Sequence, residues 1–236
     1  MRATVTPGHT PVAGDWGVLD GDRLVAILPR ESVVRRGCGP DDVRGEILAT
    51  NVDLVLVVQA FCPTPTPERT ERLLALAAAA SATPVLVLSQ VDRAPDGAAV
   101  RSALADLAVL AESCPGTHVV GVSTVPGHPG AAGLQRLRTL LPGLPAARAA
   151  AVVGPPGCGR SSLVDALSGG APRAGVGSAL VPLPGGGALV DTPGIDPVGP
   201  DWLAERYVSR LRAAQRTRWR AASGTGRRLR PLAGGA

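Results

Sequence analysis

Short apolar runs alternate with helical segments from residue 52 to residue 190, and this alternation restricts the fold more than any other feature of the chain. The apolar run at 52–58 is typical of a strand buried on both faces of a parallel sheet. Strands are predicted at 52–58, 85–88, 119–122, 149–153 and 188–190, and helices at 68–80, 100–111, 134–141 and 161–167. Repeated strand and helix units of this length predict an α/β fold: an open, mostly parallel sheet with helices on both faces.

Ahead of this region, the sequence predicts a β-hairpin. Residues 16–19 and 24–28 have the composition of strands, and Asp20-Gly21-Asp22 between them forms a tight turn. A lone hairpin is only marginally stable in water, so this hairpin is expected to pack on another part of the chain. Residues 30–44, which contain glycines, a proline and charges, are predicted to be a linker.

Positive charge is concentrated toward the C-terminus. The chain contains 24 arginines and no lysine, and its formal net charge is +5. Nine of the arginines lie in residues 201–236 beside only two carboxylates, and a helix is predicted there over 201–220. This composition favours contact with a polyanion such as RNA, although a solvated helix face followed by a tail would have the same composition.

Cysteine usage and the apolar runs bear on the cellular compartment. The four cysteines have neither the spacing of a zinc site nor that of a disulfide framework. The N-terminus lacks the apolar run of a secretion signal, and no apolar stretch is long enough to cross a bilayer. We therefore expect a cytoplasmic, monomeric protein with reduced cysteines and no membrane partner.

Residues 154–161 (Gly-Pro-Pro-Gly-Cys-Gly-Arg-Ser) have the spacing of a phosphate-binding loop, G-x-x-x-x-G-K-[ST], with arginine at the lysine position. Because this phosphate loop joins a predicted strand to a predicted helix, its backbone N–H groups and the helix N-terminus are expected to bind phosphates. Ser161 is predicted to coordinate Mg²⁺ through its hydroxyl. The predicted binding residues are Gly154, Gly157, Cys158, Gly159, Arg160, Ser161 and Ser162. The alternative is a ligand-free turn in a glycine-rich chain.

A second motif, Asp-Thr-Pro-Gly at 191–194, follows the predicted strand at 188–190. The carboxylate of Asp191 is predicted to hold a magnesium-bound water at the end of that strand. Gly194 is predicted to offer its backbone N–H to a γ-phosphate. The tetrapeptide alone is also a plausible turn, but its position thirty residues after the phosphate loop makes the functional interpretation more specific.

The third motif, Ser-Gln-Val-Asp at 89–92, follows the predicted strand at 85–88, where a GTPase carries Asn-Lys-x-Asp. Asp92 is predicted to accept hydrogen bonds from N1 and N2 of guanine, with Ser89 in the same segment. Ser123 and Thr124 fit the companion loop whose backbone N–H faces the guanine carbonyl. The alternative for Asp92 is an ordinary helix-capping aspartate.

The order of the three motifs is unusual, because in an ordinary GTP-binding domain the phosphate loop comes first and the guanine-reading motif last. Here the guanine-reading motif leads, which predicts a circularly permuted GTPase domain of the P-loop type. The motifs and their flanks resemble the ribosome small-subunit-dependent GTPase A family, which acts in maturation of the small ribosomal subunit. The resemblance runs from Pro11 to about Pro197. It includes residues 12–16, 28–30, 49–53, 154–163 and 191–194.

The resemblance implies an N-terminal oligonucleotide-binding (OB) barrel, a permuted GTPase domain and a C-terminal zinc domain. We expect a truncated OB-like β segment at 1–36, the GTPase domain at 37–200, and an arginine-rich helix and tail at 201–236. Residues 1–36 supply about half of a five-stranded barrel. No cysteine or histidine follows Cys158, so no zinc is expected.

The resemblance also places a switch segment, Gly-Arg-His-Thr-Thr in the family, between the phosphate loop and residues 191–194. The corresponding span, 173–180, lacks both the magnesium-binding threonine and the histidine proposed to assist hydrolysis, with Ser178 a weak substitute. No catalytic residue is assigned for this reason.

Two functions remain open. The first is a protein that binds GTP or GDP with Mg²⁺ and hydrolyses GTP slowly, in maturation of the small ribosomal subunit. The second is an inactive pseudo-GTPase that serves as an RNA- or ribosome-binding module. An ATPase or kinase of the P-loop type is disfavoured by Asp92 and by the motif order.

Overall fold

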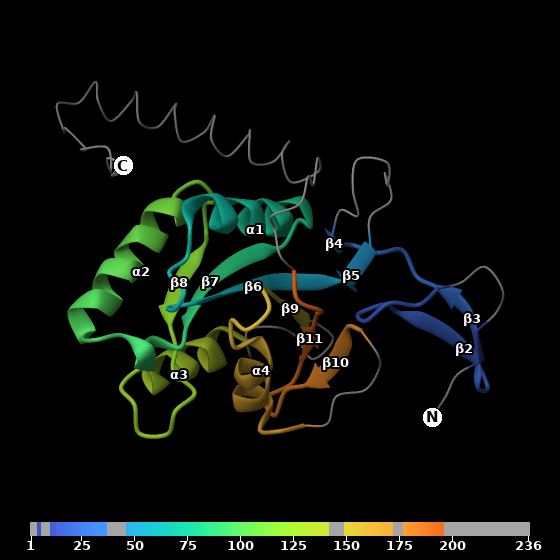
Figure 1. Cartoon of the computed structure of the whole chain (residues 1–236). Helices are drawn as coiled ribbons and strands as arrows, with labels where there is room; N and C mark the ends of the chain where they lie inside the picture. The colour runs from blue at the N-terminus through green and yellow to red at the C-terminus, as the bar shows by residue number, and fades with distance from the viewer. Residues whose placement is uncertain (1–3, 6–9, 37–45, 142–148, 172–176, 196–236) are drawn as a thin grey trace.

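The computed structural model describes residues 4–5, 10–36, 46–141, 149–171 and 177–195 (Figure 1). Its largest sheet has six strands in the order β10-β11-β9-β6-β7-β8. Four neighbouring pairs are parallel, and only the edge strand β10 runs antiparallel to its neighbour. These strands are β6 (Val52–Ala60), β7 (Thr83–Ser89), β8 (His118–Gly121), β9 (Ala149–Val153), β10 (Ala179–Pro182) and β11 (Ala188–Asp191). The predicted α/β fold with a mostly parallel sheet is confirmed.

Helices cover both faces of this sheet, as the sequence predicts. Alternate residues of β6 enter different cores: Val55 and Val57 pack with α1 and α2, whereas Leu56 and Val58 pack with α3 and α4. Both faces of the strand are therefore apolar, which explains its nearly uninterrupted apolar sequence. The helices are α1 (Pro67–Ala79), α2 (Gly97–Ala111), α3 (Ala131–Leu140) and α4 (Arg160–Ser168).

Local signals set the helix ends. Pro67 occupies the first turn of α1, where its missing N–H costs no helical hydrogen bond. Asp96 caps α2 by accepting a hydrogen bond from the Ala99 N–H at 2.8 Å. Gly169 ends α4 in the left-handed conformation, with φ of 69°, as predicted for its C-cap. In the described part of the chain, no helix combines the length and the apolar character needed to cross a membrane.

The N-terminal region contains the predicted hairpin and additional strands. β2 (Gly17–Asp20) pairs antiparallel with β3 (Arg23–Ile27), and β1 (Thr4–Val5) adds to the other side of β3. The linker predicted at 30–44 is wrong in part, because β4 (Val33–Arg36) pairs antiparallel with β5 (Glu46–Thr50). Val34 is fully buried and β4 packs against α1. This packing stabilises a strand where the composition alone favours a loop.

A cluster of polar side chains, which we call the joint, fastens the N-terminal strands to the main sheet. The Arg30 guanidinium donates to both Asp15 carboxylate oxygens, from Nε and from Nη2, each at 2.7 Å. The carboxylate also accepts from the Val12 N–H at 2.9 Å and from the Thr50 hydroxyl at 2.9 Å. Asn51, which links β5 to β6, donates from Nδ2 to the Gly14 carbonyl at 2.9 Å. The joint therefore consists of residues that carry the family resemblance.

Candidate nucleotide site

The phosphate loop, residues 154–161, connects β9 to α4, as the sequence predicts. A Cβ on Gly154 would lie 2.3 Å from the Val58 carbonyl oxygen, so only glycine fits between the loop and β6. Gly159 is the N-cap of α4 and has φ of 82°, a left-handed conformation that favours glycine. The first helical hydrogen bond runs from the Leu163 N–H to the Gly159 carbonyl at 2.9 Å. The N-terminus of α4 is therefore presented at the loop, the arrangement that attracts anions.

The serines and the cysteine of this segment have different environments. Ser161 and Ser162 are exposed at the start of α4, whereas Cys158 is buried. Burial raises the pKa of the Cys158 thiol, and this outweighs the lowering effect of the nearby Arg160 guanidinium. The thiol is therefore neutral at pH 7, and any contribution of Cys158 to anion binding comes from its backbone.

Arg160, the first residue of α4, reaches across to the segment that follows β11. Its Nη1 donates to the Thr192 carbonyl, and its Nη2 lies 3.1 Å from the position that a Cβ on Gly194 would take. Its Nε is buried and has no hydrogen-bond partner among the described residues. Sequence reasoning assigned Arg160 to phosphate binding and gave no sign of this contact with a protein carbonyl.

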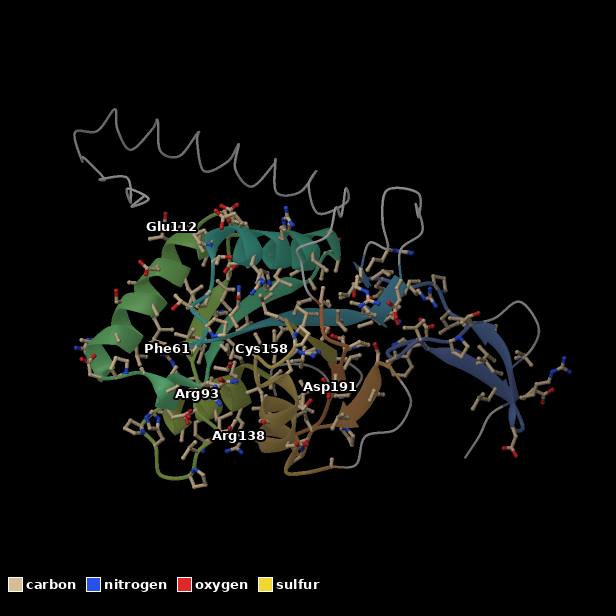
Figure 2. All side chains as sticks on the ribbon, in the orientation of Figure 1. Phe61, Arg93, Glu112, Arg138, Cys158 and Asp191 are labelled. Atoms are coloured by element: carbon tan, nitrogen blue, oxygen red, sulfur yellow. The ribbon has the colours of Figure 1, made fainter. Side chains whose placement is uncertain are left out.

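Residues 191–194 lie beside the phosphate loop. Asp191 is the last residue of β11 and is in register with Val152 of β9. The Thr192 hydroxyl donates to the Val152 carbonyl at 2.7 Å, and the Ile195 N–H donates to the Gly154 carbonyl at 3.0 Å. Figure 2 labels Asp191 at the end of β11 and Cys158 in the loop, both in the central part of the molecule.

Residues 89–92, the segment predicted to read guanine, are also bonded to the phosphate loop. The Ser89 hydroxyl lies 2.5 Å from the Cys158 carbonyl and 3.1 Å from the Gln59 carbonyl, either of which can accept its proton. Gln90, which adopts a left-handed backbone conformation, donates from Nε2 to the Gly157 carbonyl at 2.9 Å. Gln90 was not predicted as a site residue. Its position in the sequence could have indicated it: Gln90 directly follows β7, and the carboxyl ends of parallel strands meet at the same edge of a sheet.

Asp92 is oriented by the companion loop. The Ser123 hydroxyl donates to Asp92 Oδ1 at 2.6 Å and accepts from the Val125 N–H at 3.1 Å. Ser123 is fully buried, while the next residue, Thr124, is exposed. One oxygen of the Asp92 carboxylate is thus fixed by the protein, which sets the direction in which the carboxylate points.

A pocket of about 210 Å³ lies between these segments. Residues 89–93, residues 122–125 and the start of α4 each contribute to its wall. The lining includes Gln90, Asp92, Thr124, Val125, Gly159 and Ser162. The pocket brings together residues predicted from three separate stretches of sequence, and Arg93, which sequence reasoning did not single out, also lines it.

The amino-acid sequence also matches a known protein family. The model of the RsgA GTPase family matches residues 27–177, which is more than half of the chain. The chain belongs to the RsgA GTPase family. A curated relative from Xylella fastidiosa (strain M23), "Small ribosomal subunit biogenesis GTPase RsgA", is 33% identical over 239 residues. That match covers 93% of this chain and 68% of the relative, so the chain spans about two thirds of the length of this curated RsgA protein.

Two solved structures have a similar fold. YjeQ from Thermotoga maritima superposes with a TM-score of 0.55 at 24% identity, covering 73% of this chain and 55% of that chain. YloQ, described as a circularly permuted GTPase, gives a TM-score of 0.55 at 22% identity, covering 80% of this chain and 58% of that chain. The permuted order inferred from the motifs of this RsgA family member therefore has a structural counterpart.

Two of the predicted departures from the RsgA family pattern fall partly or wholly outside the described residues. Residues 172–176 of the switch span and the helix predicted at 201–220 are not described, while Ser178 directly precedes β10. Within the described ranges, His, Cys, Asp and Glu side chains form no cluster of three that could hold a metal ion. Magnesium needs no such cluster, because it is usually held by one or two protein ligands together with phosphates and waters.

Proposed function

We propose that this protein binds guanine nucleotides at the pocket beside the phosphate loop and hydrolyses GTP slowly. The observation that carries the proposal is the fixed Asp92 carboxylate in the wall of a pocket that also reaches the start of α4. A carboxylate at this position discriminates guanine by accepting its N1 and N2 protons. The backbone amides at the α4 N-terminus are suited to the attached phosphates.

The oxygen atoms of Ser161 and Asp191 are of the kind that magnesium prefers as ligands. Ser161 offers a hydroxyl at the start of α4, and Asp191 offers a carboxylate at the end of β11. A hard cation prefers such oxygen ligands, and it would supply neutralisation of the phosphate charge. The metal ligands Ser161 and Asp191, and the γ-phosphate contact of Gly194, remain part of the proposal.

The proposal includes a cellular role, in which the protein acts in maturation of the small ribosomal subunit in the cytoplasm. Its support is the name of the RsgA relatives. The division into an OB-like segment at 1–36, a GTPase domain at 37–200 and an arginine-rich end at 201–236 belongs to the same proposal. In it, the nine arginines of 201–236 contact ribosomal RNA through its phosphates.

Isothermal titration of the whole protein with GTP, GDP and ATP in Mg²⁺ tests nucleotide binding. Asp92→Ala is expected to weaken GTP binding by about 100-fold, because two charge-assisted hydrogen bonds are lost. Asp106→Ala, an exposed aspartate on α2, is the matched control and should leave the affinity unchanged. Equal affinity for ATP and GTP, or no binding at millimolar concentration, would contradict the proposal. Phosphate release with and without small ribosomal subunits then measures hydrolysis.

A pseudo-GTPase is the second candidate, and the Arg160 contact favours it. The residue at the lysine position donates to a protein carbonyl, and Ser89-Gln90 replaces Asn-Lys in the guanine-reading segment. This candidate predicts ribosomal RNA binding without nucleotide binding. Deleting residues 201–236 should then reduce both the RNA affinity and its salt dependence, and unchanged salt titrations would remove the assigned role of this segment.

A further inference from the structure

The loop that joins β8 to α3, residues 122–130, is closed by hydrogen bonds between its own residues. The Ser123 N–H donates to the Gly130 carbonyl at 3.2 Å, and the His128 N–H donates to the Val125 carbonyl at 3.3 Å. The N–H of Ala131, the first residue of α3, donates to the His128 carbonyl at 2.9 Å. The two ends of the loop are therefore bonded to each other beside the start of the helix.

The side chain of His128 adds a further bond to this loop. Its Nδ1 accepts from the Gly130 N–H at 3.0 Å, and the residue is half-buried. A ring nitrogen that accepts a hydrogen bond carries no proton, so the imidazole is neutral and its proton is on Nε2. Gly130 is the N-cap of α3 and has no side chain with which to cap the helix. The imidazole thus orders the backbone at the point where the helix begins.

Gly130 is packed against both segments that form the contact between Asp92 and Ser123. A Cβ on Gly130 would lie 2.6 Å from Val91 Cγ2 and 3.0 Å from Ser123 Cβ. Val91, the residue before Asp92, donates its N–H to the Val122 carbonyl at 3.3 Å. Because Gly130 touches both segments, a shift of its backbone would displace Ser123 or the segment that contains Asp92.

Ser123 connects Gly130 to Asp92. Its N–H donates to the Gly130 carbonyl, and its hydroxyl donates to Asp92 Oδ1 at 2.6 Å. Ser123 is fully buried, so it has little room to turn independently of these two partners. The direction of the Asp92 carboxylate therefore depends on the position of the Gly130 backbone, which His128 holds.

We propose that His128 is a positioning residue for guanine recognition. Its neutral imidazole holds Gly130, and Gly130 and Ser123 together set the direction of the Asp92 carboxylate. His128 lies outside the described lining of the pocket, so it acts without touching the base. The phosphates are assigned to a different element, the N-terminus of α4, and their binding does not depend on this loop. The inference rests on the proposed function, because it requires a guanine nucleotide in the pocket.

The first experiment compares ligands that differ in what they present to Asp92. Calorimetry in Mg²⁺ is run with GDP, with inosine diphosphate, which lacks the 2-amino group, and with inorganic pyrophosphate, which has no base. His128→Leu removes the acceptor, and GDP is expected to bind about tenfold more weakly, the effect of about one hydrogen bond. The preference for GDP over inosine diphosphate is expected to fall, while the pyrophosphate affinity stays unchanged.

Two further variants separate positioning from general damage to the fold. His128→Asn keeps an acceptor, Oδ1, at the same number of bonds from the backbone as Nδ1, and should restore the GDP affinity to within about twofold. His118→Leu is the matched control, because His118 is exposed at the first residue of β8, at the opposite end of that strand from the loop. It should leave all three affinities unchanged.

The calorimetry has outcomes that contradict the inference. Unchanged GDP affinity in His128→Leu, or an equal loss for GDP and pyrophosphate, would overturn the positioning role and leave the proposed function standing. Absence of GDP binding by the original protein at millimolar concentration would overturn both.

The second experiment needs no ligand. In the ¹⁵N-labelled whole protein, NMR is expected to show a scalar coupling between the Gly130 amide nitrogen and His128 Nδ1 across their hydrogen bond. Hydrogen exchange of the Ser123 amide is expected to be about fivefold faster in His128→Leu and unchanged in His128→Asn. Absence of the coupling, or the same Ser123 exchange rate with leucine as with histidine, would show that His128 does not hold the loop.

Discussion

Arg30 and Arg160 each connect two parts of the chain, but the two guanidinium groups differ in how fully their hydrogen-bond donors are paired. Arg30 meets the Asp15 carboxylate with two parallel hydrogen bonds, and that carboxylate is further bonded by a backbone N–H and a hydroxyl. Arg160 meets a neutral carbonyl and keeps a buried Nε without a partner in the described structure. The first arrangement is electrostatically saturated and specifies a fixed joint. The second retains donors for a further acceptor, as expected where a ligand binds.

The strongest test of this contrast is to break the saturated pair. Asp15→Ala leaves the Arg30 guanidinium without its carboxylate, and we expect a loss of about 2–4 kcal/mol in the free energy of unfolding, measured by urea denaturation. Arg36 and Glu46 form the matched pair on the surface, where the side chains are 37% and 44% exposed. Glu46→Ala should cost less than about 1 kcal/mol. Equal losses for the two substitutions would remove the distinction between the joint and an ordinary surface pair.

Acid should loosen the joint before it affects the Arg160 contact. Burial alone would raise the pKa of Asp15, but hydrogen bonds from Arg30, the Val12 N–H and Thr50 outweigh it and hold the pKa below its usual value. A lowered folded-state pKa stabilises the protein above the unfolded pKa of about 3.9, and that stabilisation is lost as the pH falls further through the folded pKa. The free energy of unfolding, measured from pH 7 to pH 2, should show this loss. In Asp15→Asn the part of the pH dependence that comes from Asp15 should be missing. An identical pH profile for Asp15→Asn would contradict the assignment.

The smallest effect concerns the unsaturated contact. Gly194→Ala places a Cβ against Pro156 and Arg160, and we expect a destabilisation of about 1–3 kcal/mol from overpacking, together with altered GDP affinity. Gly97→Ala, at the first position of α2, is the control, since its Cβ would meet only the end of Arg101 at 3.4 Å. Wild-type stability and affinity in Gly194→Ala would mean that residues 192–194 are not packed on α4.

The buried strands and their helices were predictable because burial on both faces leaves a strong apolar pattern. Two of the strands that were missed, β4 and β10, have weak patterns. β4 has one fully buried valine followed by two arginines, and β10, the antiparallel edge strand, is four residues long and ends in Pro182. Short edge strands depend on pairing with a neighbour, which sequence periodicity does not report.

The candidate site also has features that the sequence predicts and features that only the folded structure reveals. The phosphate loop, Asp92 and Ser123 could be predicted because their residue types and spacing match the chemistry expected of a nucleotide site. The tethers from Ser89 and Gln90 to the loop carbonyls, and the Arg160 contact with Thr192, join side chains to backbone atoms more than thirty residues away. Backbone acceptors carry no sequence signature, so only the folded geometry reveals these contacts.

The strand order has a consequence for how the site is made during synthesis. β6, β7 and β8 are neighbours both in the chain and in the sheet, whereas β9, β11 and β10 extend the sheet from the opposite side of β6. Because a chain emerges from its N-terminus, the half that carries Asp92 and Ser123 is complete before the phosphate loop has been translated. The pocket is lined by residues of the earlier half and of the later half, so a ligand that fills it would contact both and stabilise their association.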